Sequence, residues 1–139
     1  MLGFDLLDKT AVVTGGAGAL GSSIAKGLAQ AGARVAILGH SEAKAREVAD
    51  SIVNAGGQAV GVGVDVLDKE TLFAARDRVL DRFERVDILV NCAGGNQPAA
   101  TTGPDLSFFD LPEGAVQAVV ELNLMGSMYP TQVFGQVMA

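Results

Sequence analysis

Short apolar runs alternate along this chain with longer amphipathic stretches. The runs lie at residues 11–13, 35–38, 59–62 and 86–90, the last interrupted only by Asp87. Because successive apolar residues leave no polar face, the runs predict strands buried on both sides, as in a parallel sheet. Apolar residues at helical spacing predict a helix in each interval. The order predicts right-handed crossovers and a doubly wound, Rossmann-type α/β fold with a parallel sheet.

Capping residues mark the ends of the predicted helices. The stripe at residues 20–31 is followed by Gly32, a residue typical of the position after a helix. Ser41 and Asp68 precede the next two stripes as predicted N-caps. A last helical pattern starts at Pro112 and runs toward the end of the sequence. The complete predicted order is β-α-β-α-β-α-β-α.

Residues 94–111 interrupt this alternation. The segment is rich in Gly, Pro, Thr, Ala and Asn and has no hydrophobic period, so it predicts a long loop. We expect Phe108 and Phe109 to anchor this loop in the core rather than to contact a substrate.

Composition excludes several classes of protein. The formal net charge of −6 disfavours a nucleic-acid partner, and a single cysteine excludes an internal disulfide. No run of about 18 apolar residues predicts a membrane span, and residues 1–10 show no signal-peptide pattern. We expect a soluble, cytoplasmic protein without a membrane partner. His40 and Cys92 are the only residues of their types, so no metal site is predicted, and Cys92 is expected to be a small buried filler.

A glycine-rich turn at residues 14–21 separates the first predicted strand from the first helix. Its glycines fit G-x-G-x-x-G, which allows a tight turn and lets a diphosphate approach backbone amides at the positive end of a helix. The turn predicts a dinucleotide site, and a glycine turn without a ligand is the alternative. The residues expected to line the diphosphate and its ribose are Gly15, Gly16, Gly18, Ala19, Leu20 and Gly21. Ser22 or Ser23 could add a hydroxyl to phosphate or cap the helix.

The end of the second predicted strand bears on the choice of cofactor. Folds that prefer NAD place Asp or Glu about 20 residues past the turn, where it accepts from the ribose 2′-hydroxyl. Gly39 stands there instead. Without a carboxylate a 2′-phosphate is not repelled, and His40, Ser41 and Lys44 could contact it. We predict NADP as the cofactor. NAD is the alternative, in which Gly39 is a turn residue and Glu42 binds the ribose.

Together these motifs resemble the short-chain dehydrogenase/reductase family. Residues 14–21 resemble its T-G-x-x-x-G-x-G turn, although Ala19 stands at the family's middle glycine. Residues 65–66 resemble its adenine-contacting pair, and residues 91–94 resemble its N-x-A-G motif. Asn123 matches the helix asparagine of the family's Asn-Ser-Tyr-Lys catalytic set.

The resemblance implies a role for each matched residue. Asp65 would accept from the adenine amine beside the Val66 backbone, or would serve only as a turn residue. Asn91, Ala93 and Gly94 would let the backbone approach the nicotinamide ribose, and Asn91 could also staple neighbouring strands. Asn123 would be tied to a water that relays protons to a catalytic lysine, or would only kink its helix.

The resemblance implies an oxidoreductase that interconverts a ketone and a secondary alcohol with NAD(P). The family's catalytic Ser and Tyr-x-x-x-Lys would lie beyond residue 139. Residues 1–139 are therefore expected to be one NAD(P)-binding domain, inactive alone and homo-oligomeric at full length. Residues 91–98, 107–111 and 130–134 resemble the mannonate oxidoreductase (fructuronate reductase) subgroup, which implies a sugar-acid substrate. A non-catalytic dinucleotide-binding module is the alternative.

Overall fold

A parallel four-stranded sheet forms the centre of the molecule. The computed structural model describes residues 4–139, so three residues of the N-terminus read for a signal peptide lie outside it. The sheet has the order β3-β2-β1-β4. Its strands are β1 (Thr10–Thr14), β2 (Arg34–Gly39), β3 (Gln58–Gly63) and β4 (Ile88–Asn91). All four predicted strands are confirmed, with the fourth beginning at Ile88 rather than Val86, and β4 lies at an edge.

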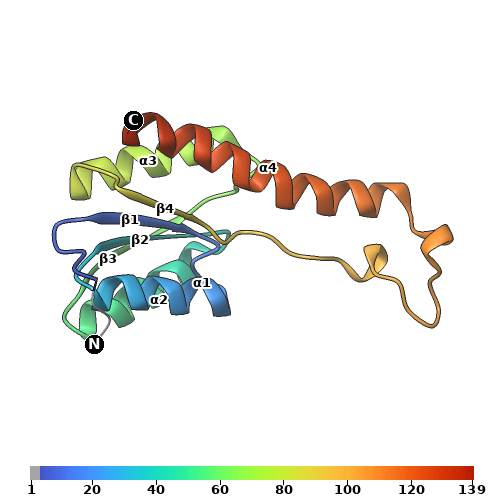
Figure 1. The fold of residues 1–139 in the computed structure, drawn as a ribbon, viewed down its shortest axis with the longest axis horizontal. Helices are drawn as coiled ribbons and strands as arrows, with labels where there is room; N and C mark the ends of the chain where they lie inside the picture. The colour runs from blue at the N-terminus through green and yellow to red at the C-terminus, as the bar shows by residue number, and fades with distance from the viewer. Residues whose placement is uncertain (1–3) are drawn as a thin grey trace.

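Helices cover both faces of this sheet (Figure 1). On one face lie α1 (Ala19–Gln30) and α2 (Glu42–Asn54), and on the other lie α3 (Lys69–Phe83) and α4 (Glu113–Met138). The sheet is thus doubly wound, as predicted. Each strand in turn connects through a helix to its successor, which places the carboxyl ends of all four strands along one edge.

The core divides into two layers because successive side chains of a strand point to opposite faces. Ala11 and Val13 of β1 pack toward the face that carries α1 and α2. Val12, between them, packs toward α3 and α4 with Phe134. All of these residues are fully buried. Covering both faces explains why the strand sequences are apolar without alternation.

The predicted helix boundaries are confirmed by their hydrogen bonds. Ser41 Oγ accepts from the Lys44 amide at 3.4 Å, and Asp68 Oδ1 accepts from the Glu70 amide at 2.9 Å. Gly32 follows α1 with φ +99°, a left-handed conformation that favours glycine. These local signals could be read from the sequence because each acts within one turn of a helix.

The long loop departs from its predicted packing. It contains two short 3₁₀ turns, η1 (Pro98–Ala100) and η2 (Phe108–Asp110), and extends with the first half of α4 past the carboxyl ends of the strands (Figure 1). Phe108 and Phe109 are 72% and 91% exposed, and their rings meet edge to face at 5.8 Å. The expectation that they anchor the loop in the core is wrong, because the loop carries them beyond the sheet.

Asp87 joins the starts of β1 and β4, at the amino ends of the strands and thus away from their carboxyl ends. Its Oδ2 accepts from the Thr10 amide at 2.9 Å, and its own amide donates to the Thr10 carbonyl. Burial raises the pKa of Asp87. The Thr10 hydrogen bond, the Arg85 hydrogen bond and charge, and the Lys9 charge outweigh that effect, so its pKa lies below the usual value.

We expect the Asp87→Asn variant to be less stable at neutral pH by about 1 kcal/mol, since asparagine keeps an acceptor for Thr10 but loses the charge. A carboxylate whose folded pKa is lowered stabilises the fold above its unfolded pKa, near 3.9. That contribution is lost as the pH falls through the folded pKa. Urea unfolding at several pH values should therefore show the difference from wild type shrinking below about pH 4. A constant difference between pH 7 and pH 3 would contradict this role.

Candidate functional site

The glycine turn between β1 and α1 is built by close backbone approaches. Gly15 has φ +61°, and a Cβ there would lie 2.7 Å from the Ala93 amide nitrogen. A Cβ on Gly21 would lie 2.2 Å from the Gly15 carbonyl oxygen. The Gly16 amide donates to the Leu38 carbonyl at 2.9 Å, which ties the turn to β2. Glycine at these positions is required by space or by φ, so the turn folds tightly against two strands.

The middle of the turn is less demanding. Gly18 has φ −77°, and a Cβ there would meet only the Gly15 oxygen at 3.4 Å. Ala19, at the family's middle glycine, begins α1 and is exposed. The departure at Ala19 is therefore accommodated at the first position of the helix, where a Cβ points outward.

The N-terminus of α1 lacks a side-chain cap. Gly18 is its N-cap residue and makes no side-chain hydrogen bond. Ser22 and Ser23 both donate their hydroxyls to the Ala19 carbonyl, at 3.2 and 2.9 Å, so neither caps the helix. The first amides of a helix have no acceptor within it and carry its positive dipole end. Those of Ala19, Leu20 and Gly21 are thus available to an anion.

A cleft of about 420 Å³ opens beside the turn at the carboxyl ends of the strands. It brings together six of the predicted site residues, namely Gly15, His40, Asp65, Val66, Ala93 and Gly94. It is completed by Leu38, Gly39, Val64 and Leu122, of which the leucines and Val64 were not predicted. Leu38 and Val64 lie at or just past strand ends, a position that could have indicated them. Leu122 comes from α4, which only the fold brings here.

At the His40 end of the cleft, two of the residues proposed for ribose recognition have other partners. Ser41 caps α2, as described above. The Glu42 carboxylate pairs with Arg46 at 2.6 Å and with Arg78 of α3 at 3.5 Å. Glu42 is thus held between two helices and does not line the cleft, and among the described residues that do, Asp65 is the only carboxylate.

Asp65 has a structural role in addition to its place in the cleft. Its Oδ1 accepts from the Leu67 amide at 2.9 Å, which closes a turn after β3. Thr71 donates its hydroxyl to the Asp65 carbonyl at 2.9 Å and holds the same turn from α3. Asp65 therefore does serve as a turn residue, which was the alternative to an adenine contact. Its contact with adenine stays a prediction.

At the opposite end of the cleft, the side chains of Thr14 and Asn123 fix the backbone of residues 92–95 by hydrogen bonds. Thr14 Oγ1 accepts from the amides of Cys92 and Ala93, at 3.1 and 3.2 Å. Asn123 Oδ1 accepts from the Gly95 amide at 3.2 Å, and its Nδ2 donates to the Gly95 carbonyl at 2.7 Å. Thr14 is a site residue that motif reading missed, although a fully buried threonine at a strand end is a detectable signal.

Asn91 and Cys92 differ in part from their predicted roles. Asn91 does not staple two strands, because its Nδ2 donates at 3.0 Å to Thr131 Oγ1 of α4. Cys92 is only half-buried, although it packs against the core on the α1 face. Neither side chain lines the cleft.

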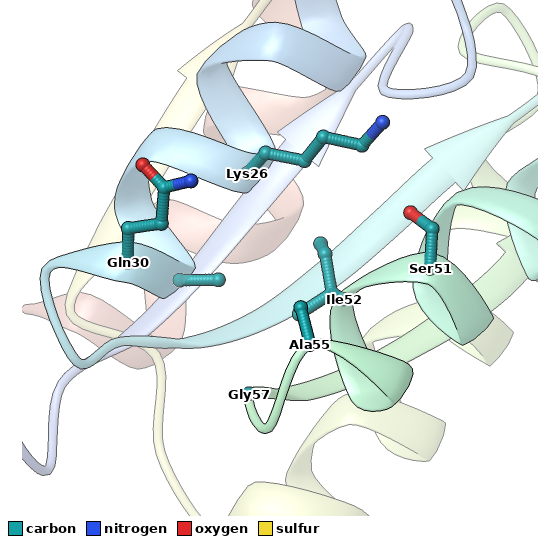
Figure 2. Close-up of a pocket in the computed structure, with 7 residues that line it drawn as sticks. Lys26, Gln30, Ser51, Ile52, Ala55 and Gly57 are labelled. Carbon is teal, nitrogen blue, oxygen red and sulfur yellow. The ribbon is translucent and has the colours of Figure 1, made fainter.

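A second depression, of about 260 Å³, lies between the C-terminal ends of α1 and α2 (Figure 2). Lys26 and Gln30 come from α1, and Ser51, Ile52 and Ala55 lie on or just after α2. Helix C-termini carry the negative end of the dipole, so this depression is unsuited to a diphosphate. The cleft at the carboxyl ends of the strands is the better candidate.

Residues 4–139 offer neither a metal site nor a membrane-spanning helix. No group of three or more His, Cys, Asp or Glu side chains in this part of the chain is placed to hold a metal ion. Nor does any helix there combine the length and hydropathy that crossing a membrane requires.

Comparison with known proteins gives the family. The sequence model of the short chain dehydrogenases matches residues 9–139. The chain belongs to the short-chain dehydrogenase family. Its fold agrees with that of a Haemophilus influenzae protein provisionally named a D-mannonate oxidoreductase and solved with bound NAD. That structure has a TM-score of 0.90 and is 36% identical, and the match covers 97% of this chain and 52% of the other.

Curated members of this family show the same coverage. The uncharacterized oxidoreductase UxuB of Bacillus subtilis (strain 168) is 42% identical over an alignment of 140 positions, which covers 95% of this chain and 50% of UxuB. L-rhamnose 1-dehydrogenase (NAD(P)(+)) of Azotobacter vinelandii is 35% identical over 91% of this chain and 48% of its own length. The chain spans about half the length of the curated relatives it matches.

Proposed function

We propose that this chain is the NAD(P)-binding domain of a short-chain dehydrogenase that interconverts a ketone and a secondary alcohol. The observation that carries the proposal is the uncapped N-terminus of α1 beside a turn in which Gly15 and Gly21 have no room for a side chain. Such a turn lets a diphosphate reach the amides of residues 15–21. The adjoining cleft is lined by residues at the ends of β2, β3 and β4, where it would continue the site.

The cleft residues divide between the two halves of a dinucleotide. Asp65 and the Val66 backbone would contact the adenine at the end of β3. Asn91, Ala93 and Gly94 would support the nicotinamide ribose at the end of β4. Bound NAD(P) would supply the hydride, and the protein would orient it and exclude water.

Asn123 acts in this proposal by positioning the start of the loop. Its amide group makes two hydrogen bonds to Gly95 and one to the Val119 carbonyl at 2.8 Å. A Cβ on Gly94 would lie only 2.6 Å from Asn123 Oδ1, so the pair packs closely. We propose that Asn123 contributes to proton relay in the whole enzyme, with its side chain fixing the helix against residues 94–95.

We propose NADP as the preferred cofactor, with NAD as the alternative. The support is that Glu42 is paired with Arg46 and Arg78 and that the end of β2 itself, at Gly39 and His40, carries no carboxylate; Asp65, which lines the same cleft, comes from the end of β3. Ser41 accepts from the Lys44 amide as the cap of α2 and keeps its hydroxyl hydrogen to donate, so His40, Ser41 and Lys44 are the groups proposed for a 2′-phosphate. The Haemophilus influenzae relative was solved with NAD, which keeps the alternative open.

The substrate class is proposed from the relatives. We propose a sugar acid of the fructuronate or mannonate type. Two observations favour it, the provisional name of the Haemophilus influenzae protein and the loop sequence at residues 91–98 and 107–111. A homo-oligomer is proposed for the whole protein. The second candidate is a dinucleotide-binding module without catalysis, since the glycine turn and the cleft by themselves provide for binding of a dinucleotide.

Titration of the complete gene product with NADPH and NADH tests this proposal. We expect NADPH to bind more tightly, and fructuronate to be reduced at the expense of the bound cofactor. Tighter NADH binding by about tenfold, or 1.4 kcal/mol, would contradict the NADP preference. Binding without turnover on a panel of keto sugar acids would favour the module. Failure to bind either dinucleotide would contradict both candidates.

A further inference from the structure

The chain between β4 and the long loop runs along α4 and is held by it at two points. Asn91 bonds to Thr131 at 3.0 Å, and Gly95 bonds twice to Asn123. Thr131 and Asn123 are eight residues apart, or about 12 Å along a helix. Four extended residues, from 91 to 95, span about 13 Å. The two spacings match, so α4 holds this segment at both of its ends.

The same segment is held from the other side by β1. Thr14 Oγ1 accepts the amides of Cys92 and Ala93, which lie between the two α4 contacts. Residues 91–95 are therefore fixed by three side chains from two elements. Asn123 and Thr14 form hydrogen bonds with the backbone of the segment, whereas Thr131 forms one with the Asn91 side chain.

The Thr131 hydroxyl has a defined direction. It donates its single hydrogen to the Ser127 carbonyl at 2.7 Å, so toward Asn91 it can only accept. This forces Asn91 to present its Nδ2 to Thr131 and turns its Oδ1 elsewhere. Both side chains are exposed, so exchanging either one leaves no cavity in the core.

We propose that Thr131 is a positioning residue for the nicotinamide half of the dinucleotide. It sets the orientation of the Asn91 amide and, through it, the end of β4 against α4. The inference rests on the proposed function, which places the nicotinamide ribose at residues 91–94. The proposed function places the adenine half against β2 and β3, which lie on the other side of β1 from β4, so its binding should not depend on this contact.

The test compares two ligands on the complete gene product. Thr131→Val keeps the shape of the side chain but can neither donate nor accept, and Thr131→Ser is the conservative control. We expect Thr131→Val to weaken binding of the preferred dinucleotide about fivefold, the effect of one net hydrogen bond, while ADP or its 2′-phosphate, which lacks the nicotinamide ribose, binds unchanged. Thr131→Ser should bind both ligands as wild type does.

A second variant tests whether the loss comes from this hydrogen bond or from a general disturbance of the fold. Asn91→Asp cannot donate to Thr131, so it should reproduce the loss, and the double variant with Thr131→Val should lose little more than either single one. Unchanged dinucleotide affinity in Thr131→Val, or an equal loss for ADP, would overturn the inference. Wild type that binds ADP but no dinucleotide would overturn the proposed function itself, which separates the two failures.

Discussion

The Gly21→Ala variant is expected to lose dinucleotide binding by about 100-fold. A methyl group there would lie 2.2 Å from the Gly15 oxygen, 2.8 Å from the Gly15 carbonyl carbon and 2.9 Å from the Gly16 Cα. All three are backbone atoms, so no side chain can rotate away and the turn must open. Losing hydrogen bonds from backbone amides to a charged phosphate would cost about 3 kcal/mol of binding free energy, which corresponds to a loss of affinity of about 100-fold. We also expect a loss of about 2 kcal/mol in the free energy of unfolding from overpacking.

Gly27 supplies the matched control for this variant. It lies on the same helix, and a Cβ there would have nothing within 4 Å. Gly27→Ala should keep wild-type affinity and gain up to about 1 kcal/mol of stability from helix propensity. Calorimetric titration with the dinucleotide and urea unfolding measure the two quantities. Wild-type affinity in Gly21→Ala would show that the phosphate does not bind at this turn.

The Gly39→Asp variant is expected to reverse the cofactor preference. A carboxylate at the end of β2 would repel a 2′-phosphate and accept from a free ribose hydroxyl. In a partly exposed cleft the combined effect is about 2.7 kcal/mol, or a 100-fold change in the ratio of NADPH to NADH affinity. The site has room for the new side chain only after a small adjustment, since its Cβ would lie 3.1 Å from Ala17 Cβ.

Gly39→Ala separates the charge from this steric adjustment. It adds the same Cβ without a carboxylate, so it should weaken both cofactors equally and leave their affinity ratio unchanged. Competition titrations with NADPH and NADH on wild type and both variants provide the comparison. If the ratio changes as little in Gly39→Asp as in Gly39→Ala, the ribose does not lie beside residue 39.

Local signals made much of the fold predictable. Buried strands lacked a polar face, and caps such as Ser41 and Asp68 act within one helical turn, so both could be read from short windows. The glycine turn was equally readable, because its demand for small residues is expressed in consecutive positions. Phe108 and Phe109 show the limit. Hydrophobicity predicted burial, but both side chains are exposed on a loop that extends past the ends of the strands.

The candidate site was only partly predictable, because its contacts join distant positions. The sequence indicated Asn91 and Asn123 but not their partners, Thr131 and Gly95, which lie 40 and 28 residues away. Glu42, the alternative residue for the ribose, pairs with Arg78, which lies 36 residues away on another helix. No short window contains such pairs.

By itself the sequence determined the alternation of strands and helices, the glycine turn and the family motifs, because each follows from periodicity or from the backbone freedom of neighbouring residues. The tertiary structure decided which of those residues share the cleft, which are already engaged by a partner and which face solvent. Those outcomes depend on how the crossovers stack strands and helices, and packing of that kind joins residues far apart in the chain.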